Sequence, residues 1–302
     1  MLNFTKMTGL GNDYIYVDCT SGVKLKNIPE LTKRISDRHF GIGADGLILI
    51  DKPENSNSDF KMRIFNSDGS EAEMCGNGIR CVAKLIHDNE LSNKDKISIE
   101  TLAGIKKVKI LEDEEGKCNE AIVDMGEPIF QDNNIPYDLY EPFNKNLILD
   151  VGEEKMRFTV VSMGNPHAVT FVQDLENIPI EKIGPMIENN PIFPNRTNVE
   201  FAQVIDKNNI KVRVWERGVG ETFACGTGAC AAVVAGGING YTDENVSVNL
   251  RGGELKIEWG KDNHIYMQGP ATTVYEGRIE AWCFYFFVLF EYSMNKIYMG
   301  EW

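Results

Sequence analysis

The residues with the clearest chemical potential are two cysteines, Cys75 and Cys225, each within a Cys-Gly-X-Gly segment. Both segments lie where a strand-and-turn pattern gives way to a helical pattern, so each cysteine is expected at a helix N-terminus. Unpaired N–H groups and the helix dipole stabilise a thiolate at that position. The glycines let backbone N–H groups approach an anionic ligand closely. We therefore expect two reactive thiols, each beside an anion-binding helix terminus.

Two such thiols on opposite faces of one carbon atom can invert its configuration. A thiolate on one face removes a proton and a thiol on the other face returns one, while the N–H groups hold the attached carboxylate. A pre-organised donor of this kind is typically worth about 3 kcal/mol. The pairs Cys75–Cys81 and Cys225–Cys230 do not have the spacing of a zinc site, so no metal is expected. Buried structural cysteine is the prediction for the others, which are Cys19, Cys81, Cys118, Cys230 and Cys283.

The two segments belong to an internal repeat with an offset of 150 residues. That offset places identical residues opposite one another: Lys61 and Lys211, Arg63 and Arg213, Glu71 and Glu221, Cys75 and Cys225, Gly76 and Gly226, and Gly78 and Gly228. Such self-similarity indicates duplicated structural units. We predict an α+β fold of two pseudo-symmetric halves, residues 1–125 and 150–280, each a mostly antiparallel sheet wrapped around a central buried helix. Residues 126–149 would be a linker and 281–302 an atypical aromatic tail.

Strand signals dominate the chain, because β-branched and aromatic runs alternate with Gly, Asn and Asp. Helical patterns are fewer and cover residues 29–39, 76–89, 180–189 and 226–240. The last of these segments is apolar almost all round, which predicts a helix that is buried on every side.

Composition limits the class of protein. The chain has 302 residues, enough for about two domains, with an ordinary globular share of 42% hydrophobic residues. A net charge of −14, without any Lys/Arg-rich stripe, argues against a nucleic acid partner. The longest apolar run, residues 281–290, is too short for a membrane span, which needs about 20 residues. Scattered cysteines and no recognisable targeting segment favour the cytoplasm.

Several motifs together resemble the diaminopimelate epimerase family. They are FNSDGSEAEMCGNGIRC, WERGVGETFACGTGACAA, MTGLGNDY, GIGADGL, SMGNPHAV and RTNVEF, in the family's order and spacing over about residues 1–280. The resemblance implies the fold that this family shares with proline racemases and phenazine-type isomerases. It also implies interconversion of LL- and meso-2,6-diaminoheptanedioate (diaminopimelate) in lysine and peptidoglycan precursor synthesis, with no cofactor and no metal. A homodimer is implied as well.

The same resemblance assigns roles to individual residues. Cys75 and Cys225 match the family's acid/base cysteines, and His167 and Glu216 match polar residues beside the thiols, although His167 could instead be a structural histidine. The backbone cradle for the reacting carboxylate matches Gly76, Asn77, Gly226 and Thr227, and the substrate-binding set matches Asn12, Asn66, Asn165, Asn198, Glu216 and Arg217. Arg217 offers a bidentate fork for the distal carboxylate. Gly46 is left out of the site because it has no side chain.

Two other functions remain open on sequence grounds. One is a racemase or epimerase for a different amino acid on the same fold, against which the Asn/Glu/Arg set for a second charged head argues. The other is a redox sensor in which Cys75 and Cys225 form a switchable disulfide. Turnover of diaminopimelate under reductant separates these possibilities. Residues 281–302 extend beyond the point where family members usually end, and no role is assigned to them.

Overall fold

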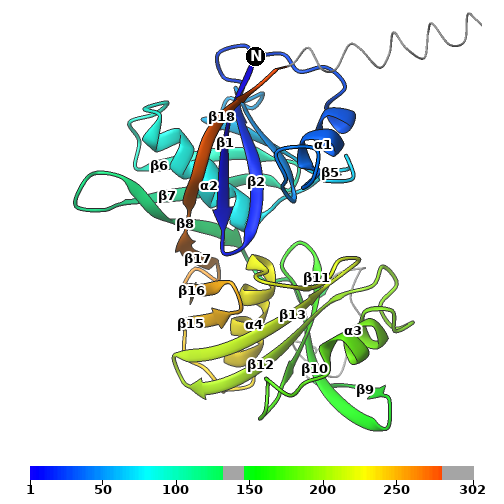
Figure 1. Cartoon of the computed structure of the whole chain (residues 1–302). Coiled ribbons are helices and arrows are strands. Elements are labelled where there is room, and N and C mark those ends of the chain that lie inside the picture. Colours follow the sequence, from blue (N-terminus) through cyan, green and yellow to red (C-terminus); the bar gives the residue numbers. More distant parts are fainter. Residues whose placement is uncertain (132–145, 281–302) are drawn as a thin grey trace, which may run out of the picture.

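The computed structural model describes residues 1–131 and 146–280 of the chain. These residues form two lobes, each built from strands around a central helix (Figure 1). Most strand pairs are antiparallel, so the fold class predicted from the sequence is confirmed. Most of the predicted linker (132–145) and the whole predicted tail (281–302) lie outside the described residues.

The first lobe surrounds helix α2 (Gly76–Asp88). Its strands are β1 (Leu2–Gly9), β2 (Asn12–Asp18), β3 (Gly46–Asp51), β4 (Phe60–Asn66), β5 (Glu71–Ala72), β6 (Lys96–Thr101), β7 (Gly104–Glu112) and β8 (Cys118–Gly126). Helix α1 (Ile28–Ser36) packs outside β3 and β4. It ends before the predicted residue 39 because the Asp37 carboxylate accepts the N–H groups of His39 and Phe40 and so forms a turn.

The second lobe surrounds helix α4 (Gly226–Ile238). Its strands are β9 (Leu147–Val151), β10 (Glu154–Ser162), β11 (Pro166–Phe171), β12 (Asn198–Asp206), β13 (Asn209–Glu216), β14 (Gly220–Thr222), β15 (Asn245–Leu250), β16 (Gly253–Trp259) and β17 (Ile265–Pro270), with helix α3 (Ile180–Glu188) outside. Residues 228–236 of α4 are all buried, in agreement with the sequence prediction. Ala and Gly dominate this helix, which lets the strands approach it from every side.

Two strand pairings join the lobes. Strand β17 pairs with β8, and the last strand, β18 (Thr272–Ile279), returns to pair antiparallel with β1. Strand β18 therefore lies in the first lobe although it follows the second helix along the chain (Figure 1). Only Ala271 separates β17 from β18 along the chain.

The internal repeat has a direct structural counterpart. Helices α2 and α4 each have 13 residues and begin 150 positions apart. In the first lobe Arg63 donates to Glu71 at 2.8 and 3.2 Å, and Arg213 donates to Glu221 at the same two distances in the second. Each ion pair bridges the two paired strands that lead to a cysteine, β4 with β5 and β13 with β14, so the repeat preserves the approach to both helices.

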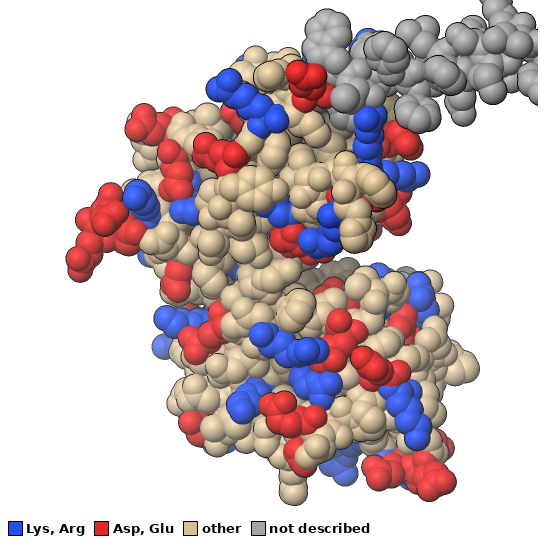
Figure 2. All heavy atoms as spheres, viewed as in Figure 1, with Lys and Arg blue, Asp and Glu red and all other residues tan. Residues whose placement is uncertain are grey.

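The surface carries mixed charge. Figure 2 shows acidic and basic side chains interspersed over the face in view, which is hollowed where the two lobes meet. No helix among residues 1–131 and 146–280 is long and apolar enough to cross a membrane.

Candidate active site

Each of the two cysteines begins a helix, as predicted. Cys75 is the N-cap of α2, and its sulfur accepts a hydrogen bond from the Gly78 N–H at 3.3 Å. Cys225 is the N-cap of α4 and accepts from the Gly228 N–H at 3.4 Å. Both cysteines have extended backbone conformations, which are usual for an N-cap residue. Both sulfurs therefore lie at the positive end of a helix dipole.

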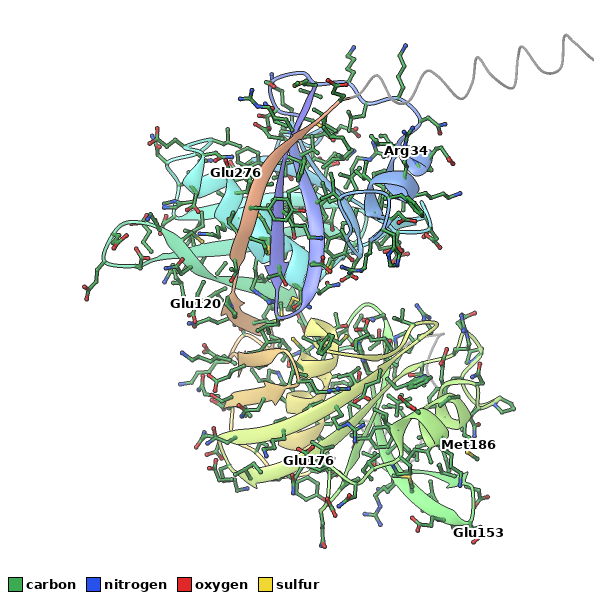
Figure 3. The ribbon with its side chains drawn as sticks, viewed as in Figure 1. Arg34, Glu120, Glu153, Glu176, Met186 and Glu276 are labelled. Atoms are coloured by element: carbon green, nitrogen blue, oxygen red, sulfur yellow. The ribbon has the colours of Figure 1, made fainter. Side chains whose placement is uncertain are left out.

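The two helix N-termini meet in the centre of the molecule. A Cβ atom added to Gly76 would lie 2.9 Å from Cε of Met267, and one added to Gly226 would lie 3.0 Å from its Sδ. The Asn77 amide donates to the Ala224 carbonyl at 3.2 Å, which ties the first turn of α2 to the residue before Cys225. Side chains of both lobes come together here, where the β1–β2 turn faces the start of α4 (Figure 3). One packing contact and one hydrogen bond thus hold the two thiol sites side by side.

The Cys75 thiol faces a fixed acceptor. Its S–H donates to Asn12 Oδ1 at 3.1 Å, and the Asn12 amide nitrogen donates to the Asp45 carboxylate at 2.8 Å. Because an ionised carboxylate only accepts, Asp45 determines which way the Asn12 amide points. Arg38 in turn pairs with both Asp45 and Asp13. The result is a continuous polar chain from the surface to the sulfur.

The Cys225 thiol lies at the end of a different polar chain. Its sulfur is 3.4 Å from Thr227 Oγ1, which accepts from the Asn165 amide at 3.4 Å. Asn165 Oδ1 is 3.0 Å from His167 Nε2, and His167 Nδ1 is 2.7 Å from the fully buried Glu200 carboxylate. His167 therefore contacts Cys225 through two intervening side chains rather than directly. One oxygen of Glu200 has no hydrogen-bond partner among the described residues.

Glu216 influences both thiols. Its carboxylate accepts from the Thr222 hydroxyl at 2.5 Å, and burial raises its pKa above the ordinary glutamate value. Burial raises the pKa of Cys75 to about 11, with the negative charge of Glu216 adding to the effect and the Gly78 N–H opposing it. Burial, Glu216 and then Glu200 raise the pKa of Cys225 well above its usual range. Both cysteines thus favour the neutral thiol in this environment.

The remaining predicted residues lie on neighbouring strand ends and turns. Asn198 is opposite His167 in the parallel β11–β12 pair; it donates to the Pro166 carbonyl at 2.9 Å and accepts the Arg217 backbone N–H at 2.9 Å. The Arg217 guanidinium donates to the Asn195 carbonyl at 3.0 Å. Asn66 donates to Ser70 within its own turn. Within residues 1–131 and 146–280, no hydrogen bond joins Asn66 or Arg217 to either sulfur.

Several charged residues of this region were not predicted from the sequence, and Asp45, Glu200 and Arg80 are the ones nearest the thiol sites. Asp45 and Glu200 lie inside the quoted motifs GIGADGL and RTNVEF, but neither was given a role. A usable signal existed for Glu200, since an acidic residue in the apolar strand run NVEFA is unexpected unless it has a buried partner. Arg80 likewise interrupts the apolar face of a helix that had to be buried.

The arrangement places two thiols at helix N-termini, where they could transfer protons. No group of three or more His, Cys, Asp or Glu side chains that could hold a metal occurs in the described part of the chain. Cys75 and Cys225 are both free thiols. Two surface hollows of about 700 and 440 Å³ are lined by residues of β15 and β16 such as Asn245, and neither includes a thiol. The converging helix N-termini therefore remain the candidate site.

Comparison with known proteins points to one family. The family model described as diaminopimelate epimerase matches residues 4–131 and 159–274. The chain is 52% identical over 280 residues to the diaminopimelate epimerase of Acetivibrio thermocellus, which covers 92% of this chain and 99% of that protein. It is 55% identical over 284 residues to the diaminopimelate epimerase of Methanococcus maripaludis, with 92% of this chain and 100% of that protein covered.

Solved structures share the fold at much lower identity. A phenazine biosynthesis protein of the PhzF family from Bacillus anthracis superimposes with a TM-score of 0.66 at 18% identity, covering 92% of this chain and 99% of that chain. A probable proline racemase from Agrobacterium radiobacter K84 also gives 0.66, at 13% identity, with 93% of each chain covered. At these identities the likeness establishes the fold alone.

Proposed function

Because this chain belongs to the diaminopimelate epimerase family, we propose that Cys75 and Cys225 are the acid/base pair of its reaction. That reaction is the interconversion of LL- and meso-diaminopimelate in lysine biosynthesis, so the chain is an isomerase. The observation that carries the assignment of the pair is the meeting of two cysteine-capped helix N-termini on Met267. A substrate carbon held between them has one ionisable sulfur on each side.

The proton balance of the reaction follows from this geometry. One sulfur, as thiolate, takes the α-proton and becomes a thiol, while the opposite thiol delivers its proton to the other face and becomes a thiolate. The backbone N–H groups at the starts of α2 and α4 stabilise the charge that builds on the α-carboxylate between the two transfers. After each turnover the two sulfurs have exchanged protonation states, and proton exchange with solvent resets them.

Of the other predicted site residues, some would bind the substrate and others would act indirectly on the thiols. The cradle of the α-carboxylate would be Gly76, Asn77, Gly226 and Thr227, and the substrate-binding set Asn12, Asn66, Asn165, Asn198, Glu216 and Arg217. Arg217 is proposed to bind the distal carboxylate, since its contact with the Asn195 carbonyl uses only one of the five N–H donors of the guanidinium. His167 would act through Asn165 and Thr227, and Glu216 through its charge on both thiols.

The wider setting is also a proposal. The reaction needs no cofactor and no metal because the thiols and helix N-termini supply its groups. We place the enzyme in the cytoplasm, as a homodimer, with its product serving peptidoglycan precursor synthesis as well as lysine. Residues 1–125 and 150–280 would be the two homologous halves of the sequence, joined by 126–149, although β18 at the end of the second half pairs with β1 in the first lobe.

A deuterium experiment tests the two-thiol mechanism. With LL-diaminopimelate in deuterium oxide and reductant, the early meso product should carry deuterium at the inverted carbon, while recovered substrate stays mostly protiated. The reason is that the abstracting thiol holds only the proton it took, and the delivering thiol has already exchanged with solvent. Cys75→Ala and Cys225→Ala should each abolish epimerisation. Early protium transfer into product, or near-normal activity of either variant, would contradict the mechanism.

A further inference from the structure

Helix α2 contains a buried cation that the proposed mechanism has not yet used. The Arg80 side chain is 0% exposed and is the largest fully buried side chain of the described residues. It lies one turn beyond Cys75, and its guanidinium points back toward the start of the helix, where it donates to the Gly76 carbonyl at 3.2 Å. A buried charge is costly unless another group compensates it, so its retention calls for a physical reason.

None of the acceptors around Arg80 carries a charge. Besides the Gly76 carbonyl, Arg80 donates to the Pro270 carbonyl at 3.1 Å and to Asn77 Oδ1 at 3.0 Å, and it is 3.7 Å from Met267 Sδ. No ion pair between described residues includes Arg80, whereas the repeat-related Arg63 and Arg213 each pair with a glutamate. Arg80 therefore has its hydrogen bonds satisfied while its charge is left without an anion.

The Arg80 charge needs an anion, and the groups that shift the pKa of Cys75 indicate that the Cys75 thiolate could be that anion. Arg80 acts on the sulfur from α2, Glu216 from β13, and the neutral hydroxyls of Tyr14 and Tyr16 from β2. Asp45 acts through Asn12. Arg80 is the only cation among these groups of the described chain, and its charge lowers the pKa of Cys75 against the effect of burial. The same charge also acts on Cys81, but that thiol is fully buried in α2 and has no place in the proposed reaction, which leaves Cys75 as the anion to consider.

The second half of the repeat has no equivalent cation. The residue 150 positions beyond Arg80 is Cys230, which is buried and uncharged at neutral pH. Cys225 instead faces the carboxylates of Glu216 and Glu200. The two thiol sites thus share their helix geometry but differ in the charge behind the sulfur.

We infer that Arg80 is a positioning residue that acts as the buried counter-charge of the Cys75 thiolate and makes Cys75, rather than Cys225, the first thiol to ionise in the free enzyme. Each state of Cys75 then has its own partner. Asn12 Oδ1 accepts the proton of the thiol, and the Gly78 N–H and the Arg80 charge stabilise the sulfur once that proton has left. Through Asn77 the same guanidinium holds the connection to Ala224, so the charge and the alignment of the two sites depend on one side chain. The inference rests on the proposed catalytic role of the thiols.

The test measures thiol ionisation in the free enzyme and needs no turnover. Reduced protein is treated with short pulses of iodoacetamide from pH 7 to 12.5, a window that brackets the raised pKa of Cys75, and alkylation of Cys75 and Cys225 is followed separately by mass spectrometry of fragmented peptides. The midpoint of each rate against pH reports the ionisation of that sulfur, independently of its accessibility. In the wild-type enzyme the Cys75 midpoint should lie below that of Cys225, and a midpoint at or above it would overturn the inference.

Three variants separate charge from structure. Arg80→Met should raise the Cys75 midpoint by up to about one pH unit, the low end of the effect of an opposite charge in direct contact. Arg80→Lys keeps the charge and should restore most of that shift even if activity stays low. Arg63→Met removes a cation of the same lobe that pairs with Glu71, and should leave the midpoint unchanged. Circular dichroism establishes which variants are folded.

Each possible result either supports or overturns the role of the Arg80 charge in the ionisation of Cys75. A folded Arg80→Met enzyme with the wild-type Cys75 midpoint, or equal shifts in Arg80→Met and Arg80→Lys, would overturn the role of the charge. If Arg80→Met does not fold, the wild-type comparison and Arg80→Lys still decide. Failure of the two-thiol mechanism itself would appear elsewhere, as epimerase activity remaining in Cys75→Ala or Cys225→Ala.

Discussion

Because Met267 contacts both helix N-termini, the substitution Gly226→Ala should disturb their spacing. The new methyl group would lie 3.0 Å from Sδ and 3.4 Å from Cε of Met267, so one side must move by several tenths of an ångström. Overpacking a core costs about 1–3 kcal/mol, and alanine returns up to about 1 kcal/mol of helix propensity. We expect a net loss of about 0–2 kcal/mol in the free energy of unfolding, which leaves the enzyme folded.

The effect of Gly226→Ala on activity should be larger than its effect on stability. A displacement near 1 Å at a reacting centre can cost about 100-fold in rate, so a shift of roughly half that size should lower kcat/KM about 10-fold. The coupled epimerase assay gives kcat/KM, and urea unfolding gives the stability. Gly237→Ala is the matched control, because it adds a methyl group to the same helix 3.2 Å from Trp259 but far from either thiol. Equal kcat/KM in the two variants would refute the idea that Met267 sets the spacing of the helix N-termini.

The remaining predictions concern binding, redox state, pH and stability. Arg217→Ala should lower kcat/KM by 10- to 100-fold, since a charge-assisted hydrogen bond is worth about 1.5–3 kcal/mol, and an unchanged value would place recognition of the distal carboxylate elsewhere. Mild oxidation should link Cys75 to Cys225 and abolish activity reversibly; full activity of the verified disulfide form would contradict the assignment. Because the pKa of Cys75 is raised to about 11, its thiolate fraction and hence kcat/KM should rise with pH from 7 to 9, and a flat profile would argue against thiolate catalysis. Arg213→Met should destabilise the protein more than Arg63→Met in urea unfolding, because Arg213 also donates to three backbone carbonyls and is less exposed.

Local signals predicted the helices well but not the path of the chain between lobes. Cys-Gly-X-Gly followed by an apolar run specifies where α2 and α4 begin, because the N-cap and the first turn are set by neighbouring residues. The return of β18 to β1 depends on pairing between residues more than 260 positions apart, such as Leu2 with Ile279. A period-2 pattern shows that a strand exists, but it does not name the partner strand.

In the site, too, local contacts could be predicted from the sequence, whereas contacts between the lobes could not. The motifs led to the residues nearest the sulfurs, Asn12 and Thr227 among them, because each motif keeps them close in the chain to a glycine-rich turn or a helix start. Asn77 was expected to contribute only its backbone, yet its side chain also bridges to Ala224 in the other lobe. That contact spans 147 residues and depends on how the lobes pack, which no local pattern encodes.

The repeat explains why the remaining charges escaped prediction. Comparing the halves draws attention to identical positions, and these turned out to build what the two sites share: the cysteines, their glycines and the Arg–Glu pair before each helix. A reaction that treats two faces of one carbon differently also needs differences between the halves. Arg80 stands opposite Cys230, and Glu200 opposite Ile50, so each charge behind a thiol falls where the repeat is broken. In a duplicated fold, buried charges at non-identical positions are therefore the first candidates for what distinguishes one active half from the other.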